Sequence, residues 1–469
     1  MRSRILVPVL VYLAMTTSVV SSLGAPLVPT IARETHVSLA TAQWSLTISL
    51  LVGAVATPTL GRLGDGRHRR TAALFALVAV VLGCVLAGLP GPFAQLLVGR
   101  GLMGIGLGLV PLTMAVARDT TDEVRRPRVV GLLSVSAVAG IGLGYPLTGL
   151  VAEHLGFRAA FWLGGGVAAL ALVLAALVVP STSHRPATRL DVVGALLLAA
   201  GSAGLLLALG QAETWDTGLV LGLAALSLLV GAAWIAWELR VDEPLVQLRL
   251  LRDRTVLTAN LTGLLAGVGM FMLMSVIIRF AQTPSSTGYG LGASIVVSGL
   301  LLVPLSVLST ASSRIAPALG RRFGQRAVLP IGCAVFVVAN LVFAFERSHL
   351  WELTVVTAIA GLGIGCTFAA LPGLIIAHVP ADQTGSAMSV NLVIRYIGYS
   401  TGSALSATVL EAHTAAGQVL PGNGGYTVVA LTAVAVLTVA GVVSAVVPGR
   451  ETPPPDDLVE ESLTEAIAD

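Results

Sequence analysis

The chain has 469 residues, of which 55% are hydrophobic and 11% are charged, and its formal net charge is +3. A soluble domain carries about a quarter of its residues as charged side chains, so this composition excludes an ordinary soluble protein and indicates a membrane protein. The apolar runs are long and continuous rather than alternating, which excludes an outer-membrane barrel. All basic residues are Arg. Because nearly all of them lie in short loops, we expect no nucleic-acid binding.

Fourteen apolar runs are long enough to cross a bilayer as helices, which rise 1.5 Å per residue. Each run must be helical, because lipid offers no partner to the backbone of an isolated segment. The first run has no clear cleavage site, so we interpret it as a span rather than a signal peptide. The predicted spans are residues 5–31, 42–60, 71–89, 93–117, 129–152, 159–179, 190–210, 218–238, 256–280, 294–313, 327–346, 351–378, 386–411 and 425–447.

The arginines are distributed unevenly between the two sets of loops. An even number of spans places both termini on one side, and the segments on that side hold 21 of the 27 basic residues. The opposite loops hold Arg33, Arg158 and Arg347. Cytoplasmic loops carry the excess of Arg. We therefore expect a multi-pass protein of a bacterial cytoplasmic membrane with both termini in the cytoplasm.

The sequence repeats weakly at an offset of 256 to 258 residues. Gly104, Gly106 and Gly108 of the fourth span recur as Gly361, Gly363 and Gly365 of the twelfth. Because six spans occupy only about 180 residues, this offset predicts two extra spans between two six-helix halves. Such repeats place a substrate site between the halves. The predicted segments are an N-terminal bundle 1–180, a two-helix insert 181–255, a C-terminal bundle 256–447 and a disordered acidic tail 448–469.

The loop after the second span carries a short motif of Gly, Leu, Asp and paired Arg. Its residues are Gly61, Leu63, Asp65, Arg69 and Arg70. They resemble the signature of the major facilitator superfamily, from which Gly66 and His68 depart. The resemblance implies an all-α fold of two pseudo-twofold related halves, and a latch in which Asp65 and the Arg pair close the cytoplasmic gate. The alternative is that these arginines only set the topology.

Arg100 lies about two turns inside the fourth span, where an ionised side chain is costly unless it is paired or hydrated. Arg100 and Gly104 resemble the Arg-x-x-x-Gly element that the superfamily associates with proton coupling. Gly104 and Gly108 follow Arg100 along one helix face. The alternative is an Arg bonded to backbone carbonyls, without a role in transport.

The fifth span is rich in Gly and contains one Pro. Its sequence resembles the Gly-Pro motif that marks antiporters in the superfamily, although Tyr145 and Leu150 depart from it. Small residues allow close helix contact, and a Pro bends the helix. The alternative is ordinary helix packing. The motif residues are Gly140, Gly144, Pro146 and Gly149.

The thirteenth span carries Arg395 near mid-membrane, with Asn391, Tyr396 and Tyr399 within a turn. We predict that these four residues line a central cavity. Gln43-Trp44 and the segment from Pro244 to Leu250 resemble the fourteen-span drug:proton antiporter branch. That branch carries an acid in its first span, whereas this chain has none there or deep in any other span. The missing acid favours neutral or anionic amphiphiles over lipophilic cations and weakens the case for proton antiport.

The expected function is therefore secondary export of small amphiphilic molecules by alternating access, with the proton gradient as the energy source. We expect no enzymatic activity. We expect no cofactor or metal: there is no P-loop or HExxH helix, and Cys84, Cys333 and Cys366 lie in apolar runs without metal-site spacing. The expected partners are the substrate, protons and lipid, with no obligate protein partner. The alternatives are an importer or facilitator on the same fold, a scaffold that transports nothing, and a membrane-embedded enzyme.

Overall fold

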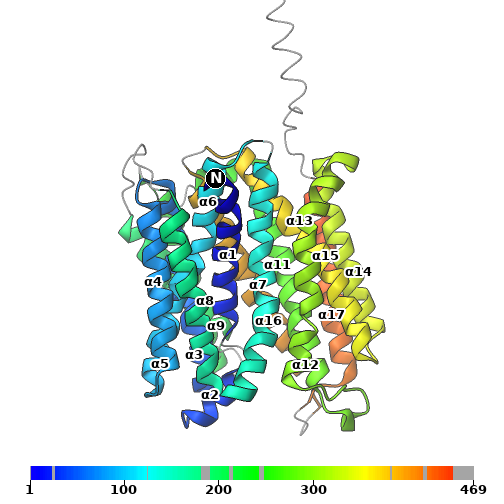
Figure 1. The fold of residues 1–469 in the computed structure, drawn as a ribbon. Coiled ribbons are helices and arrows are strands. Elements are labelled where there is room, and N and C mark those ends of the chain that lie inside the picture. Colours follow the sequence, from blue (N-terminus) through cyan, green and yellow to red (C-terminus); the bar gives the residue numbers. More distant parts are fainter. Residues whose placement is uncertain are drawn as a thin grey trace, which may run out of the picture.

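The computed structural model consists of helices and connecting loops throughout the residues it describes (Figure 1). The acidic tail lies outside these residues, as do parts of the loops on either side of the insert. The described residues are 2–23, 27–37, 39–123, 125–180, 191–210, 215–241, 244, 248–380, 383–415 and 420–446.

The described residues of the first half form eight α-helices and a short 3₁₀ turn between α5 and α6. They are α1 (Arg2–Ser22), α2 (Val28–Glu34), α3 (Leu39–Asp65), α4 (Arg69–Gly88), α5 (Phe93–Ile105), α6 (Leu109–Thr120), α7 (Arg126–Leu155) and α8 (Phe157–Val178). The segment predicted to be an insert, 181–255, contains α9 (Val192–Gly210) and α10 (Thr217–Glu238).

In the second half, the part that the structure describes forms seven α-helices. They are α11 (Arg254–Gln282), α12 (Ile295–Leu300), α13 (Val303–Phe323), α14 (Val328–Phe345), α15 (Leu350–Ala377), α16 (Thr384–Ala412) and α17 (Asn423–Val446). Within the described residues, nine helical segments are long and apolar enough to cross a membrane, and α1 and α9 add two shorter apolar helices. The all-helical multi-pass prediction is confirmed, whereas the count of fourteen spans stays a prediction.

Three predicted spans are interrupted. The run 5–31 divides into α1 and α2, and Pro29 occupies the first turn of α2. The run 294–313 divides into α12 and α13, with Pro304 in the first turn of α13. The fourth span changes to a 3₁₀ turn at Gly106–Gly108, because Pro111 has no N–H to donate to the carbonyl of Leu107. Hydropathy alone does not register these breaks, since Pro and Gly are common in membrane helices.

The helices pack as two bundles that meet along a few helices. In the first bundle α1 packs on α7 and α8, and in the second α11 packs on α16 and α17. The bundles meet where α3 and α6 contact α16, and where α7 contacts α12, α13 and α15. Helix α9 packs on α10 and α3 and also reaches α16, through Leu198 and Val390.

The repeated glycines lie at equivalent helix contacts in the two bundles. A Cβ added to Gly104 on α5 would lie 2.4 Å from the Ser49 carbonyl oxygen on α3. A Cβ on Gly361 of α15 would lie 2.5 Å from the Leu305 carbonyl oxygen on α13. Each glycine therefore lets two backbones touch. The internal repeat in the sequence thus corresponds to a repeated packing geometry.

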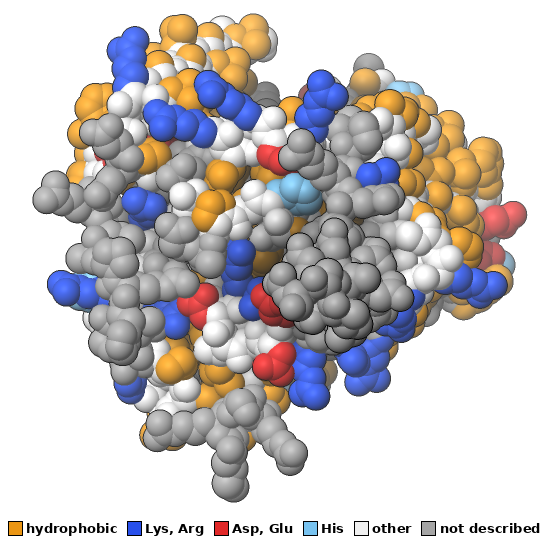
Figure 2. Space-filling model, turned by 90° about the horizontal axis from the view of Figure 1, so that it is seen from above, with side chains coloured by type: hydrophobic (Ala, Val, Ile, Leu, Met, Phe, Trp, Pro, Cys, Tyr) orange, Lys and Arg blue, Asp and Glu red, His pale blue; other side chains and the backbone are white. Residues whose placement is uncertain are grey.

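One end of the bundle carries the N-terminus, and we call it the terminal face. Helix α6 ends there, as does α3, while α5 begins at the opposite face (Figure 1). Seen from above, the terminal face carries many basic side chains among the apolar ones (Figure 2). The distribution agrees with the arginine count of the loops.

Candidate functional site

Near the terminal face the two bundles touch backbone to backbone. A Cβ added to Gly61 on α3 would lie 1.7 Å from Ser389 Oγ and 2.7 Å from the Gly385 carbonyl oxygen, both on α16. Ser389 Oγ donates to the Thr57 carbonyl oxygen on α3, at 3.1 Å. The motif residue Gly61 therefore lies at the contact between the halves, where a larger side chain would force them apart.

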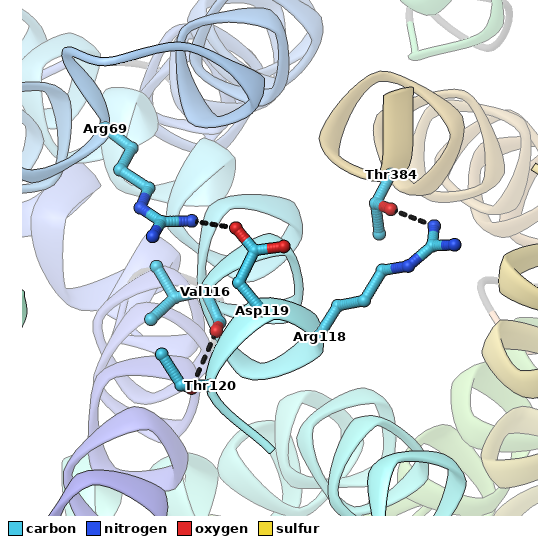
Figure 3. Close-up of polar contacts among 6 residues, drawn as sticks. All are labelled: Arg69, Val116, Arg118, Asp119, Thr120 and Thr384. Carbon is cyan, nitrogen blue, oxygen red and sulfur yellow. Dashed lines mark hydrogen bonds and ion pairs between the residues drawn. The ribbon is translucent and has the colours of Figure 1, made fainter. Parts of the chain in front are cut away.

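Arg118, at the end of α6, bonds across the same interface. Its Nη2 donates to the carbonyl oxygen of Val379 at 2.9 Å, and its Nη1 donates to that of Pro380 at 3.2 Å. Nη1 also donates to Thr384 Oγ1 at the start of α16 (Figure 3). Val379 follows the last turn of α15, where a cation is stabilised by the helix dipole. One guanidinium of the first half thus holds two helices of the second.

Arg69 and Arg70 bond within the first half. Arg69 Nη1 donates to Asp119 Oδ2 at 2.5 Å, and this ion pair lies next to Arg118 (Figure 3). Arg70 Nη2 donates to the Ala176 carbonyl oxygen on α8, at 2.6 Å. Leu63 is half-buried, and the side chain of Asp65 lies outside the described residues. The latch assigned to Asp65 therefore stays a prediction, whereas Arg69 orients the end of α6 that carries Arg118.

Arg100 is buried inside the first bundle, with 1% of its surface exposed. Its Nε donates to the Ser45 carbonyl oxygen at 2.9 Å, and its own carbonyl accepts from Ser49 Oγ at 2.8 Å. Nη1 is buried and has no partner among the described residues. Gly104, one turn on, brings α5 against α3, so the Arg-x-x-x-Gly element fixes the guanidinium between these two helices.

The Gly-Pro motif of α7 faces two partners. A Cβ on Gly140 would lie 2.9 Å from the Met15 carbonyl oxygen of α1, so Gly140 packs within the first half. A Cβ on Gly299 of α12 would lie 3.0 Å from Pro146 Cα, so Pro146 packs against the second half. Gly144 and Gly149 are buried. The motif therefore spans an internal and an inter-half contact.

Arg395 lies on α16 at the interface, and 2% of its surface is exposed. Its Nη2 and Nε donate to the Tyr399 hydroxyl at 2.9 and 3.3 Å, and its Nη1 donates to Ser134 Oγ of α7 at 3.3 Å. The guanidinium carbon lies 3.7 Å from the centre of the Phe368 ring on α15. The predicted cavity residue thus bonds to both halves.

Two further predicted residues surround Arg395. Asn391 Nδ2 donates to Asn260 Oδ1 of α11 at 3.2 Å, and the Tyr396 ring meets the Tyr399 ring edge-on at 5.8 Å. All four predicted residues lie on α16, and Arg395 joins them to the first half through Ser134. The central cavity that they are expected to line stays a prediction.

Several residues of both sites are absent from the set that the sequence predicts. Two of them are the neighbours Arg118 and Asp119, which lie near the end of a predicted span among the basic residues of the terminal side. The acid beside two basic clusters was the available signal for the ion pair. No pattern in the sequence singled out Ser134 or Phe368, because each is one of many similar residues in an apolar helix.

Two helical bundles therefore meet along an interface that contains polar contacts and the buried guanidinium of Arg395. The chain belongs to the Major Facilitator Superfamily, whose family model matches residues 10–403 and 259–467. It is therefore a multi-pass membrane protein, and its family points to a transporter rather than an enzyme.

The similar proteins are named for different substrates. The chain is 26% identical over 380 residues to the multidrug transporter protein MdtP of Bacillus subtilis, covering 79% of this chain and 69% of that protein. It is 27% identical over 416 residues to a uridine/deoxyuridine transporter of Lactococcus lactis, covering 85% of each. Among solved structures, the human organic anion transporter MFSD10 matches with a TM-score of 0.64 and 18% identity, covering 94% of this chain and 99% of that one. That likeness shows the fold alone.

Proposed function

We propose that this protein exports small amphiphilic organic molecules by alternating access, in exchange for protons. The observation that carries the proposal is the inter-half contact near the terminal face. Gly61 lies against Ser389 there, and Arg118 bonds to Thr384. These contacts join the halves through small and polar groups that can separate. Arg395 lies deeper in the same interface, where a substrate would meet it once the halves part.

The proposed topology has fourteen spans, arranged as six, two and six, with both termini in the cytoplasm. Support comes from the arginines of the terminal face, since cytoplasmic loops carry the excess of Arg. Helices α9 and α10 supply the central pair. On this assignment the contacts of Arg118 close the cytoplasmic side.

Export is favoured by the resemblance of the α7 motif to that of antiporters and by the multidrug relatives. The second candidate is an importer or facilitator, which the uridine/deoxyuridine relative favours. The two differ in direction and in dependence on a proton gradient. A scaffold that transports nothing would show no flux with any ligand.

The first experiment measures efflux from cells expressing the protein. The cells are loaded in turn with a cationic dye, a neutral amphiphile and an anionic amphiphile, with and without a protonophore. Efflux that stops with the protonophore supports a proton-driven exporter. Flux down the concentration gradient of the substrate, unaffected by the protonophore, supports the facilitator. Absence of flux for all three kinds of amphiphile contradicts both candidates.

An engineered disulfide between the halves tests whether flux requires them to separate. A Cβ at position 61 lies 2.9 Å from Ser389 Cβ, and a disulfide needs about 3.8 Å, so a small separation accommodates the bond. We expect the double variant Gly61→Cys, Ser389→Cys to lose flux on oxidation and regain it with reductant. The single variant Gly61→Cys is the matched control, and the three native cysteines are buried. Undiminished flux through the fully cross-linked carrier would rule out alternation at this interface.

A further inference from the structure

The guanidinium of Arg395 is a buried positive charge that no acid neutralises in the described part of the chain. The ion pairs found there join Arg69 to Asp119, Arg126 to Glu123 and His349 to Glu352. Arg395 is instead bonded to two neutral hydroxyls. An ionised side chain inside a membrane protein normally pairs with an opposite charge or lines a functional path. Within the described residues, Arg395 therefore meets neither an acid nor another counter-ion.

The donors of Arg395 exceed the acceptors around it. A guanidinium has five N–H groups in a planar fork that fits a carboxylate or phosphate through two parallel bonds. The structure gives Arg395 two bonds to the Tyr399 oxygen and one to Ser134 Oγ, with lengths of 2.9 to 3.3 Å. Bonds to neutral oxygens are weaker than bonds to an anion. The site thus keeps capacity for a bidentate anionic partner.

Aromatic rings hold the guanidinium plane in place. Phe368 lies against one face, with 3.7 Å between its ring centre and the guanidinium carbon. The Tyr399 ring stacks on Phe271 of α11, with 4.6 Å between centres and 22° between planes. Both supports belong to the second half. A fixed Arg among aromatic rings suits a planar ligand, because ring faces attract both cations and flat apolar groups.

The contact with Ser134 crosses to the first half. If α7 and α16 separate, Arg395 loses this bond but keeps Phe368 and Tyr399, which move with it. The guanidinium then faces the opened interface, and its Nη1 has lost the Ser134 acceptor. An anion entering from that side replaces the hydroxyl.

We propose that Arg395 binds the anionic group of the substrate, and that the substrate is a planar aromatic carboxylate. This inference rests on the proposed function, since it identifies the ligand of the same interface. In the carrier without substrate, Ser134 accepts the guanidinium hydrogen bond that the substrate anion would otherwise accept. Phe368 and Tyr399 present the guanidinium to the ligand.

The test measures binding and transport separately, with three probes of nearly equal size. They are 2-naphthoate, 2-naphthamide and 2-naphthyltrimethylammonium. Binding is measured by calorimetry on purified protein in phosphatidylcholine nanodiscs, which lack acidic lipid. We expect the carboxylate to bind at least about tenfold more tightly than the amide, which corresponds to about 1.4 kcal/mol, and the cation to bind most weakly. Tighter binding of the cation or the amide overturns the proposal, as does no carboxylate binding up to millimolar concentration.

Variants assign the preference to this residue. We expect Arg395→Gln to remove the preference for the carboxylate over the amide, and Arg395→Lys to retain part of it through charge without the fork. Arg279→Gln removes the same charge from an exposed position on α11 and should leave the preference intact. A preserved preference in Arg395→Gln overturns the proposal. If that variant does not fold, the affinities of the wild-type protein for the three probes, together with those of Arg395→Lys, still test the proposal.

Transport of the same probes from proteoliposomes separates this inference from the proposed function. Carboxylate binding without flux of any probe contradicts the transporter while leaving the anion site standing. Flux of the cation in preference to the carboxylate contradicts the anion site while leaving the transporter standing. Replacing a fifth of the phosphatidylcholine by phosphatidylglycerol then tests a lipid headgroup as the anion. Loss of carboxylate binding there would assign the site to lipid and overturn the substrate proposal.

Discussion

Arg118 of the first half donates a hydrogen bond to Thr384 of the second half. The same guanidinium donates to the carbonyl oxygen of Val379, which follows α15 in the chain. Its neighbour Asp119 holds Arg69 at 2.5 Å. Two adjacent residues at the end of α6 therefore face opposite ways, one into its own half and one across the interface. This arrangement separates what keeps the first half folded from what keeps the two halves together.

Replacing Arg118 by Ala should open the terminal face without unfolding the protein. Hydrogen bonds from a charged donor contribute about 1.5–3 kcal/mol, which corresponds to a population shift of about ten- to a hundredfold. Spin labels on the exposed positions Thr71 and Arg321 would report the separation of the halves by pulsed electron resonance. We expect longer distances to gain population in the variant.

The matched control for that measurement is Arg70→Ala. Arg70 bonds to the Ala176 carbonyl within the first half, so its removal takes away a charge near the same face without touching the interface. Distances that change equally in both variants would contradict the cross-half role of Arg118.

Asp119→Asn should destabilise the first half, because it leaves the buried Arg69 without its counter-ion. The side chains of Arg69 and Asp119 are 4% and 19% exposed, and breaking one partner of a largely buried pair costs about 3 kcal/mol. A double-mutant cycle with Arg69→Gln, followed by thermal unfolding of the purified protein, measures the coupling. We expect the double variant to be more stable than the sum of the two single changes predicts. Strict additivity would show that the pair is not coupled.

Two glycines of similar exposure should respond differently to Ala. Gly61 touches the other half, whereas Gly104 touches α3 of its own half, with a Cβ only 2.4 Å from the Ser49 carbonyl oxygen. Gly61→Ala should shift the halves apart with little change in melting temperature. Gly104→Ala should lower the melting temperature, because two packed backbones must move.

Gly222→Ala is the control for this pair. A Cβ at Gly222 on α10 meets nothing within 4 Å, so the change should leave both readouts near the wild type. Equal loss of melting temperature in Gly61→Ala and Gly104→Ala would contradict the distinction between an inter-half and an internal contact.

The sequence predicted the helices well and the interface partly. Continuous apolar runs determine spans because lipid leaves the backbone no other bonding, and the described helices follow the predicted runs to within a few residues in most cases. Arg395 was identified because a charge in an apolar run is conspicuous. Phe368 and Ser134 were not, since their importance comes from which helix faces which, and that requires the packing of α7, α15 and α16. The role of Arg118 was hidden among charges that the positive-inside rule already explains.

Arg347 should be a stability residue rather than a transport residue. It lies in the loop between α14 and α15, and its guanidinium donates to the Phe343 and Ala344 carbonyls, to Asn423 and to Thr427. Burial lowers the pKa of this guanidinium from its ordinary value. Arg347→Gln leaves several buried acceptors without donors, each costing about 1–3 kcal/mol. We expect a clear fall in melting temperature with efflux retained at low temperature, measured against the exposed Arg279→Gln. Loss of efflux in a variant of unchanged stability would assign Arg347 to transport instead.

Arg100 is the residue for which coupling and structure can be separated most directly. Its Nε is bonded to the Ser45 carbonyl while the buried Nη1 has no partner among the described residues, so the side chain is held in place but not neutralised. If it couples transport to protons, Arg100→Gln should reduce flux driven by a pH gradient in proteoliposomes by at least about tenfold, or about 1.4 kcal/mol in barrier terms. Exchange of labelled for unlabelled substrate, which needs no gradient, should persist. Ser49→Ala is the control, because it removes the hydroxyl bond to the Arg100 carbonyl without changing charge. Wild-type gradient dependence in Arg100→Gln would end the coupling assignment, and parallel loss of driven flux and exchange would make Arg100 a packing residue of the α3–α5 contact.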